Sequence, residues 1–381
     1  MLKLILKKMG IIIGIGILIL VLGIILFLYL SPQFGGTPTA VQEEKFSLTN
    51  HYKEGKFINS GNVDMSMGLQ DMGKSIVGYF KQTKGVIPEQ PILVETILPS
   101  DLLNYTGKIR LFWFGHSTFL LQIQSKNILI DPMFGEVPAP HPMLGSKRFS
   151  NHLPITIKDL PRIDAVLISH DHYDHLDYDS ISKLKDKVDA FYTPLGVGSH
   201  LESWGISKDK IHELDWWEEI MFSDLKFVCT PAQHFSGRGI SDKAKTLWSS
   251  WIITSKDDNI FFSGDSGYGK HFKDIGEKYG PFDFAMIECG QYNTLWHDIH
   301  MYPEETVQAA LDVKAKLMMP IHWGAFKLAM HEWNEPVERL LEASKTQNIN
   351  IIVPKIGQEI QIEKDTNNTE AWWDEVNAEA N

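Results

Sequence analysis

Cysteine and basic side chains are both scarce in this sequence, and each shortage excludes a class of protein. The 381 residues include only two cysteines, Cys229 and Cys289, which are too few for a disulfide scaffold. Both stand in apolar, strand-like runs, so we expect them to be small buried side chains. The 36 Lys and Arg are outnumbered by 48 Asp and Glu, giving a net charge of −12. This balance argues against nucleic acid as a partner, because phosphate backbones are held mainly by clustered Lys and Arg.

The rest of the composition is that of a folded protein. Hydrophobic residues make up 43% of the chain and charged residues 22%, which excludes an intrinsically disordered protein. The length suits one large domain or two ordinary ones, either of which can bury a sizeable core.

Charge is absent from one long stretch near the amino terminus. After Lys8 no charged residue appears until Glu43, and the run from Met9 to Leu30 is almost entirely apolar. At about 1.5 Å per residue this run is long enough to cross a bilayer. It is longer than a usual signal-peptide core and lacks a small-x-small cleavage site, which favours an uncleaved anchor over a removed signal.

The residues around this run predict the topology of the anchor. Lys3, Lys7 and Lys8 precede the run, so the positive-inside rule predicts a single-pass protein with a cytoplasmic amino terminus and an exported catalytic domain. Gly10 and Gly14 form a small-xxx-small spacing that is compatible with a homodimer.

A polar segment follows the apolar run. Residues 31–61 are rich in Gly, Pro, Thr and Asn, and we expect them to form a linker that lifts the domain off the membrane. A helix is a candidate between Met65 and Lys84.

The most informative stretch is I-S-H-D-H-Y-D-H-L-D at residues 168–177. It places His170, His172, Asp174 and His175 within six residues, directly after the apolar run Ala165 to Ile168 that predicts a buried strand. Imidazole nitrogens and carboxylate oxygens are the ligands that Zn²⁺ and similar metals prefer. Surface histidines in a polar loop are the alternative, but this density favours metal ligands, and four of them could serve two adjacent ions.

Three later strands each end beside a single candidate ligand. Apolar runs at residues 225–230, 259–263 and 317–321 are followed by His234, Asp265 and His322 respectively. A lone His after a strand is more often structural than catalytic. The recurrence of the pattern downstream of the histidine-rich turn favours a joint role.

Other polar residues at strand ends suggest supporting roles. Strands are expected at residues 109–115, 119–124 and 127–131. His116 is expected to hydrogen-bond a neighbour, and Asp131 is either an orienting partner of a ligand or a plain turn residue. His141 and His152 lie in a proline-rich loop and are expected to face solvent.

The H-x-H-x-D-H pattern after an apolar strand resembles the signature of the metallo-β-lactamase superfamily. More narrowly, the sequence resembles the branch that contains N-acyl-phosphatidylethanolamine-hydrolysing phospholipase D, over roughly residues 109–362. The strings that carry this resemblance are Trp248-Ser249-Ser250-Trp251, residues 263–268, His300 before Pro303-Glu304-Glu305, and residues 321–324.

The resemblance implies a site with two zinc ions per chain. By this resemblance one zinc is held by His170, His172 and His234 and the other by Asp174, His175 and His322, with Asp265 bridging both. It also implies an α/β protein with a four-layer αβ/βα sandwich, the metallo-β-lactamase fold, and this domain would follow the single N-terminal transmembrane helix that the apolar run predicts. The expected boundaries are an anchor and linker start at 1–35, a linker and N-terminal extension at 36–95, the hydrolase domain at 96–364 and an acidic tail at 365–381.

The same resemblance implies cleavage of a phosphodiester in a membrane phospholipid. The implied reaction converts N-acylated phosphatidylethanolamine to N-acylethanolamine and phosphatidic acid. Asp174 and Asp265 would orient the attacking water, and His300 would steady the phosphate or protonate the leaving oxygen. Tyr173, His300 and Arg238 are candidate substrate contacts, although Arg238 could equally be a surface residue. The sequence departs from this family at position 299, where it has Ile299 and the animal phospholipase D has a polar residue.

Two other functions stay open at this stage. A zinc hydrolase of small substrates such as lactones or β-lactams would use the same ligands, and a membrane-tethered binding protein with a degenerate site is the non-enzyme alternative. Together with the anchor and the family resemblance, a set of apolar side chains near the expected mouth favours a lipid substrate, although ordinary core or rim packing is the alternative for each of them. These residues are Trp216, Trp217, Met221, Phe235, Trp296 and Trp323.

The remaining expectations concern the carboxyl-terminal half. Helices are expected at residues 178–187, 270–279, 303–313 and 336–345. Ile351 to Ile362 is expected to close the second sheet. The tail from Asp365 is expected to be disordered, unless Trp372 and Trp373 dock onto the domain.

Overall fold

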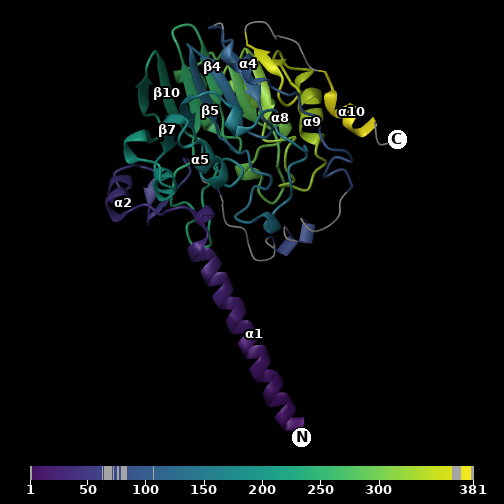
Figure 1. Ribbon diagram of the computed structural model, residues 1–381. Coiled ribbons are helices and arrows are strands. Elements are labelled where there is room, and N and C mark those ends of the chain that lie inside the picture. Colours follow the sequence, from purple (N-terminus) through teal and green to yellow (C-terminus); the bar gives the residue numbers. More distant parts are fainter. Residues whose placement is uncertain are drawn as a thin grey trace.

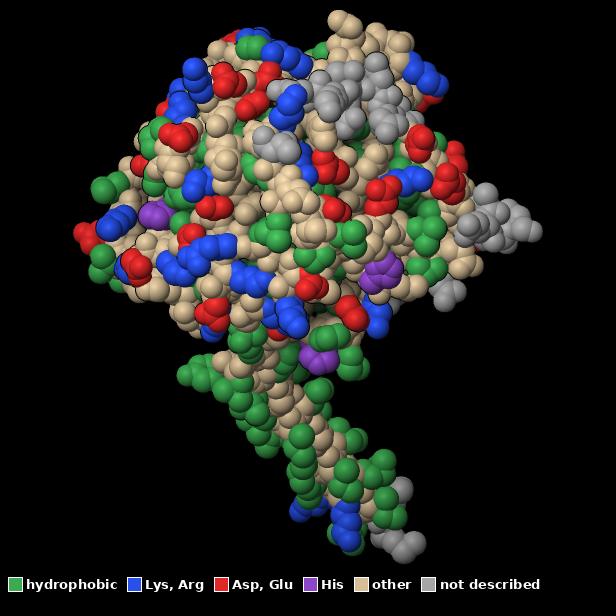
Figure 2. Space-filling model, turned by 45° about the horizontal axis from the view of Figure 1, so that its top comes forward, with side chains coloured by type: hydrophobic (Ala, Val, Ile, Leu, Met, Phe, Trp, Pro, Cys, Tyr) green, Lys and Arg blue, Asp and Glu red, His purple; other side chains and the backbone are tan. Residues whose placement is uncertain are grey.

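The computed structural model describes residues 2–61, 63, 71, 73, 74, 77, 78, 84–105, 107–362 and 370–378. The long helix α1 (Leu2–Leu30) projects from a rounded domain, on the side away from α4 (Pro99–Leu103) (Figure 1). Apolar side chains cover α1 along its length (Figure 2), and none of its apolar window is buried inside the protein. By length and composition the helix could cross a membrane or act as a signal sequence.

Within the described residues, two seven-stranded sheets form the centre of the domain. The first sheet has the strand order β16-β3-β4-β5-β6-β7-β8, in which β5, β6, β7 and β8 run parallel. Its strands are β3 (Arg110–Trp113), β4 (Phe119–Ile123), β5 (Lys126–Ile130), β6 (Ile163–Leu167), β7 (Val188–Pro194), β8 (Ile211–Leu214) and β16 (Glu359–Gln361).

The second sheet has the order β15-β14-β13-β12-β11-β10-β9, with a parallel half from β12 to β15. Its strands are β9 (Glu219–Phe222), β10 (Leu225–Thr230), β11 (Ser250–Thr254), β12 (Asn259–Phe262), β13 (Phe284–Glu288), β14 (Leu317–Ile321) and β15 (Asn350–Ile351). Strands with both faces buried are typical of parallel sheets that are covered on each side.

The alternation of side chains along each strand builds the layers. In β6, Ala165 and Leu167 join the core between the sheets, whereas Val166 faces the opposite way and packs among residues of α5 (Tyr178–Leu184) and α6 (Gly198–Ser203). The second sheet is covered by α7 (Lys270–Lys278), α8 (Pro303–Asp312) and α9 (Glu335–Ser344). The protein is therefore the expected four-layer sandwich, and the four expected helices are confirmed.

Ile351 to Ile362 does not close the second sheet as a unit. Only Ile351 at its start lies in β15, while β16 pairs antiparallel with β3 of the first sheet. Gly357 explains the split, because its φ of 91° lets the chain turn, and its amide bonds the carbonyl of Trp113 in the other sheet.

The carboxyl-terminal tail is partly ordered, so the expectation of disorder is wrong for α10 (Trp372–Ala378). Both tryptophans of this helix are buried, and Trp372 stacks on Trp323 with ring centroids 5.5 Å apart. The alternative, that the tryptophans dock, is confirmed. Residues 365–369 lie outside the described part of the chain.

The segment at residues 31–61 is not a free linker. It forms a short helix, α2 (Ala40–Phe46), and a hairpin of β1 (Tyr52–Lys53) and β2 (Lys56–Phe57). Phe46 and Phe57 are buried in the main core. The segment is polar overall, so its composition did not predict that it packs on the domain. Burial of only two phenylalanines is enough to fix so short a segment. Most of the candidate helix at Met65 to Lys84 lies outside the described residues.

Candidate metal centre

The candidate ligands meet at one edge of the sandwich because the strands that carry them end there. β5 and β6 are parallel neighbours in the first sheet, and β12, β13 and β14 are parallel neighbours in the second. The carboxyl ends of parallel strands lie at the same edge of a sheet, where irregular turns can present polar side chains. The turns after these strands, together with the turn after β10, supply every candidate ligand: His170, His172, Asp174, His175, His234, Asp265 and His322.

Three imidazoles form the first part of the cluster. His172 Nδ1 lies 2.9 Å from His170 Nε2 and 3.2 Å from His234 Nε2. His234 donates the proton on its Nδ1 to the carbonyl of Ile299, so in the neutral ring Nε2 carries a lone pair. Burial and the neighbouring histidines hold the pKa values of His170 and His234 well below the ordinary value. His170 and His234 are therefore neutral, and one nitrogen of each of the three rings lies close enough to the others to bind the same metal ion.

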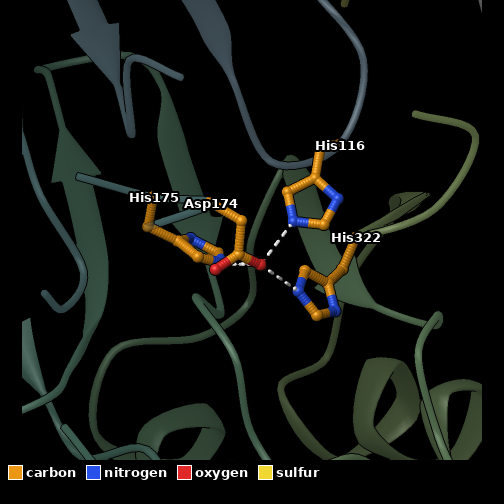
Figure 3. A group of neighbouring side chains, drawn as sticks. All are labelled: His116, Asp174, His175 and His322. Atoms are coloured by element: carbon orange, nitrogen blue, oxygen red, sulfur yellow. Dashed lines mark hydrogen bonds and ion pairs between the residues drawn. The ribbon is translucent and has the colours of Figure 1, made fainter. Parts of the chain in front are cut away.

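Asp174 organises the second part of the cluster (Figure 3). Its Oδ2 lies 2.8 Å from His116 Nε2, 3.2 Å from His322 Nε2 and 3.4 Å from His175 Nε2. The expectation that His116 bonds a neighbour is confirmed, since it donates to Asp174. Burial and the nearby His322 lower the pKa of His116 to about 3, so this ring is neutral.

Asp265 lies between the two parts. Its Oδ2 is 3.0 Å from His322 Nε2 and 3.8 Å from His170 Nε2, while its Oδ1 is 3.1 Å from His175 Nε2. Burial opposes the charge on Asp265, but His175 and His322 outweigh that effect and hold its pKa well below the ordinary value. A carboxylate in this position can bridge two cations.

The buried atoms of the cluster fit metal ions. Within the described structure, His175 Nε2 and Asp265 Oδ1 are buried and make no hydrogen bond. Nitrogen and oxygen atoms of the cluster approach within 4.8 Å of one another in several overlapping groups. Buried polar atoms that make no hydrogen bond are costly, and a cation bound between them would satisfy them. The cluster is therefore able to bind metal.

Asp131 takes the orienting role rather than that of a plain turn residue. Its Oδ2 accepts from His175 Nδ1 at 2.7 Å, and its Oδ1 accepts from the backbone amide of Ser169 at 2.7 Å. This contact fixes the orientation of the His175 ring and turns its Nε2 toward the cluster. Asp131 and His322 adopt φ values of 40° and 66°, a left-handed geometry that side chains rarely adopt outside functional or tightly packed turns.

Sequence reasoning missed Glu288, the last residue of β13. This carboxylate is fully buried, accepts from His300 Nδ1 and from the amide of Ser266, and lies 3.3 Å from His322 Nδ1. It therefore holds the His300 ring by a hydrogen bond and lies beside the His322 ring. The sequence does contain a signal for Glu288, because β13 is another apolar run that ends on an acidic residue.

A cavity of about 240 Å³ opens onto the cluster. His300 is on its wall beside four candidate ligands, and its ring stacks on that of His322 at a centroid distance of 5.2 Å. The full lining is His172, Asp174, Phe235, Asp265, Gln291, Trp296, Ile299, His300, His322 and Leu328. His300 is thus placed where a substrate would bind.

Tyr173 and Arg238 are not part of this lining. The Tyr173 hydroxyl donates to the carbonyl of Arg238, and burial raises the pKa of this phenol. The Arg238 side chain is 4% exposed and donates to the carbonyls of Gln33, Asp171 and Leu176. Arg238 is therefore not a surface residue: backbone carbonyls accept from its Nε and Nη1, while its Nη2 is buried and has no hydrogen-bond partner among the described residues.

The apolar residues expected at the mouth separate into two groups. Phe235 and Trp296 line the cavity. The others do not: Trp216 and Trp323 are buried in the core, Trp217 stacks on Tyr279, and Met221 is exposed on β9. His141 and His152 are exposed, as expected for their loop.

Comparison with known proteins identifies similar chains. The profile of the beta-lactamase superfamily domain matches residues 126–323. An uncharacterised protein of Mycobacterium tuberculosis is 39% identical over 336 residues, covering 85% of this chain and 89% of its own. N-acyl-phosphatidylethanolamine-hydrolyzing phospholipase D 1 of Caenorhabditis elegans is 34% identical over 262 residues, covering 65% of this chain and 73% of its own. Among solved structures, the isothiocyanate hydrolase from Delia radicum gut bacteria has the same fold, with a TM-score of 0.53, 23% identity and coverage of 66% and 98%.

Proposed function

The chain belongs to the beta-lactamase superfamily, as one of its metallo-hydrolases, and from this premise we propose that it is a dinuclear zinc phospholipase of the D type. Its substrate is an N-acylated phosphatidylethanolamine in a membrane. Water attacks the phosphorus, the bond to the ethanolamine oxygen breaks, and that oxygen takes up a proton. The products are N-acylethanolamine and phosphatidic acid.

One observation carries the proposal: seven side chains from four separate turns bring their nitrogen and oxygen atoms into one buried cluster. The turn at 168–175 supplies four of them, and β10, β12 and β14 lead to His234, Asp265 and His322. The chemistry of this donor set suits zinc. His170, His172 and His234 would hold one ion, Asp174, His175 and His322 the other, and Asp265 both. Two bound zinc ions would supply a nucleophilic water near neutral pH and offset charge on the phosphoryl oxygens.

The residues of the chain itself position the reactants. Asp174 and Asp265 line the cavity, where their carboxylates can orient the attacking water and accept its proton. His116 donates to Asp174 and so fixes the direction of that carboxylate. On the cavity wall, His300 is held through Nδ1 by Glu288, and its Nε2 can donate to the phosphate or to the leaving oxygen.

The size of the cavity supports a lipid head group as the part that enters. Its volume of about 240 Å³ is below the 300–1,000 Å³ typical of pockets that enclose a whole drug-sized ligand. A phosphodiester head group could enter while the acyl chains stay outside. Phe235, Trp296 and Leu328 give the wall an apolar side that could contact those chains.

The helix α1 supports a location at a membrane. We propose that it is a single-pass anchor with the amino terminus in the cytoplasm, because Lys3, Lys7 and Lys8 lie at its start and its other side chains are apolar. The catalytic domain would then act on the opposite side of that membrane, where its substrate is concentrated at the surface.

A substrate panel tests the proposal. The purified full chain, loaded with zinc, is incubated separately with vesicles containing N-acylated phosphatidylethanolamine, with a lactone and with a cephalosporin. Mass spectrometry should detect N-acylethanolamine and phosphatidic acid, and His172→Ala should release neither. Hydrolysis of the lactone or cephalosporin without release of N-acylethanolamine would overturn the lipid assignment and favour a hydrolase of small substrates.

A further inference from the structure

The junction between α1 and the domain contains no spacer. The helix ends at Leu30, and residues 31–36, here called the strap, pack at once against the domain. Trp204 Nε1 donates to the carbonyl of Pro32 at 2.7 Å, and Arg238 Nε donates to the carbonyl of Gln33 at 2.8 Å. These two bonds hold the strap directly after the last turn of the helix.

The strap lies too close to the domain for larger side chains. A Cβ atom on Gly36 would stand 2.4 Å from the carbonyl oxygen of Ser199, and one on Gly35 would stand 2.1 Å from Nδ1 of His200. Gly35 also has a φ of 72°, which favours glycine. The strap is therefore seated on α6, and the direction of α1 relative to the domain is fixed.

Arg238 connects the strap to the candidate metal centre. Its Nη1 donates to the carbonyls of Asp171 and Leu176, which lie within the histidine-rich turn. A single side chain thus separates the strap from the turn that carries four candidate ligands. The centre consequently lies near the end of the domain from which α1 leaves. The helix leaves on the side away from α4 (Figure 1).

Two loops beside this junction expose large apolar side chains. Met143 is 86% exposed, and the loop that carries it contacts α1 through the rings of His141 and Phe27, whose centroids lie 6.2 Å apart. Ile240 is 81% exposed and lies two residues beyond Arg238, the residue that binds the strap. Apolar side chains with this exposure at loop tips are unfavourable in water and favourable in the interfacial zone of a bilayer.

We propose that the face around the foot of α1 is a bilayer-docking surface, with Met143, Leu144 and Ile240 inserted into the leaflet that α1 enters. The partner is the lipid surface itself, because the rigid strap leaves no length of chain by which the domain could move away from it. The inference rests on α1 being a membrane span and extends the proposed function. It explains how acyl chains can remain in the bilayer while a head group reaches the cavity.

Site-directed labelling tests the surface without any enzymatic turnover. The native thiols of Cys229 and Cys289 are buried, so a single introduced cysteine can be labelled selectively. Met143→Cys and Ile240→Cys of the full chain are labelled with an environment-sensitive fluorophore and reconstituted into phosphatidylcholine vesicles. Leu103→Cys is the matched control, because Leu103 is 73% exposed but lies in α4. Resistance to alkaline extraction verifies that α1 is inserted in each preparation.

The expected result is a blue-shifted emission at positions 143 and 240 that is quenched by lipids with a nitroxide on the acyl chain. Position 103 should show neither effect. Emission and quenching at 143 and 240 equal to those at 103, in vesicles that retain the protein, would overturn the docking surface. Because the readout needs no catalysis, this failure is distinguishable from a failure to hydrolyse N-acylated phospholipid.

Discussion

Arg238 offers the sharpest test of how the metal centre is held in place. The substitution Arg238→Met keeps much of the length and apolar packing of the side chain and removes its guanidinium. Three carbonyls then lose a donor, and those of Asp171 and Leu176 belong to the turn that carries four candidate ligands. We therefore expect both weaker metal binding and a less stable domain.

The magnitude follows from the number and burial of the lost contacts. A hydrogen bond from a charged donor contributes about 1.5–3 kcal/mol, and contacts that share one side chain are not additive. The expected loss in the free energy of unfolding is therefore about 2–4 kcal/mol. Residues that orient ligands from outside typically change metal affinity by about 10–100-fold, and we expect Arg238→Met to fall in that range.

Competition with a chelator measures the metal affinity, and chemical denaturation measures the stability. Arg162→Met is the matched control, because Arg162 pairs with Asp189 at the surface and its side chain is 72% exposed. This control should change stability by less than about 0.5 kcal/mol. Unchanged metal affinity in Arg238→Met, together with a raised KM for an anionic substrate, would refute the reasoning and return Arg238 to an anion contact.

Three further predictions follow from buried contacts. Asp131→Ala removes the acceptor that holds His175 and should weaken metal binding by about 10–100-fold in the same competition assay, so an unchanged affinity would argue against its orienting role. Phe57→Ala should lower the free energy of unfolding by about 3–5 kcal/mol, since Phe57 is buried in the main core. Leu48→Ala, at an exposed position nearby, should cost less than about 0.5 kcal/mol, and equal effects of the two changes would contradict the packing of this segment. His300→Gln should reduce kcat by about 10²–10⁴-fold while the zinc content stays constant, whereas wild-type kcat would remove it from the reaction.

The centre of the fold was predictable because its signals are local. Apolar runs of four to seven residues mark buried strands, and a polar residue directly after such a run marks the edge where ligands meet. The histidine-rich turn and the turns at His234, Asp265 and His322 could be combined because parallel strands must end at one edge. Glu288 also stands at the end of an apolar run, but a glutamate at the end of a strand is too common to predict a functional role by itself.

The parts that could not be predicted depend on contacts between distant residues. Nothing near Arg238 in the sequence indicates that carbonyls of Gln33 and Asp171 surround it. The segment at 31–61 reads as polar, and only the finished core provides the site that buries Phe46 and Phe57. The split of residues 351–362 between two sheets likewise depends on a turn at Gly357 and on a partner, β3, that lies far away in sequence.

The most direct test of the central claim compares zinc content and turnover in the wild-type chain and in Asp265→Asn. Asp265 is the carboxylate that touches both parts of the cluster. Elemental analysis should find two zinc ions per wild-type chain, which should release N-acylethanolamine from N-acylated phosphatidylethanolamine. Asp265→Asn should lose at least one of the two ions and nearly all of this turnover. If Asp265→Asn kept wild-type turnover with an unchanged zinc content, the dinuclear hydrolase described above would be contradicted.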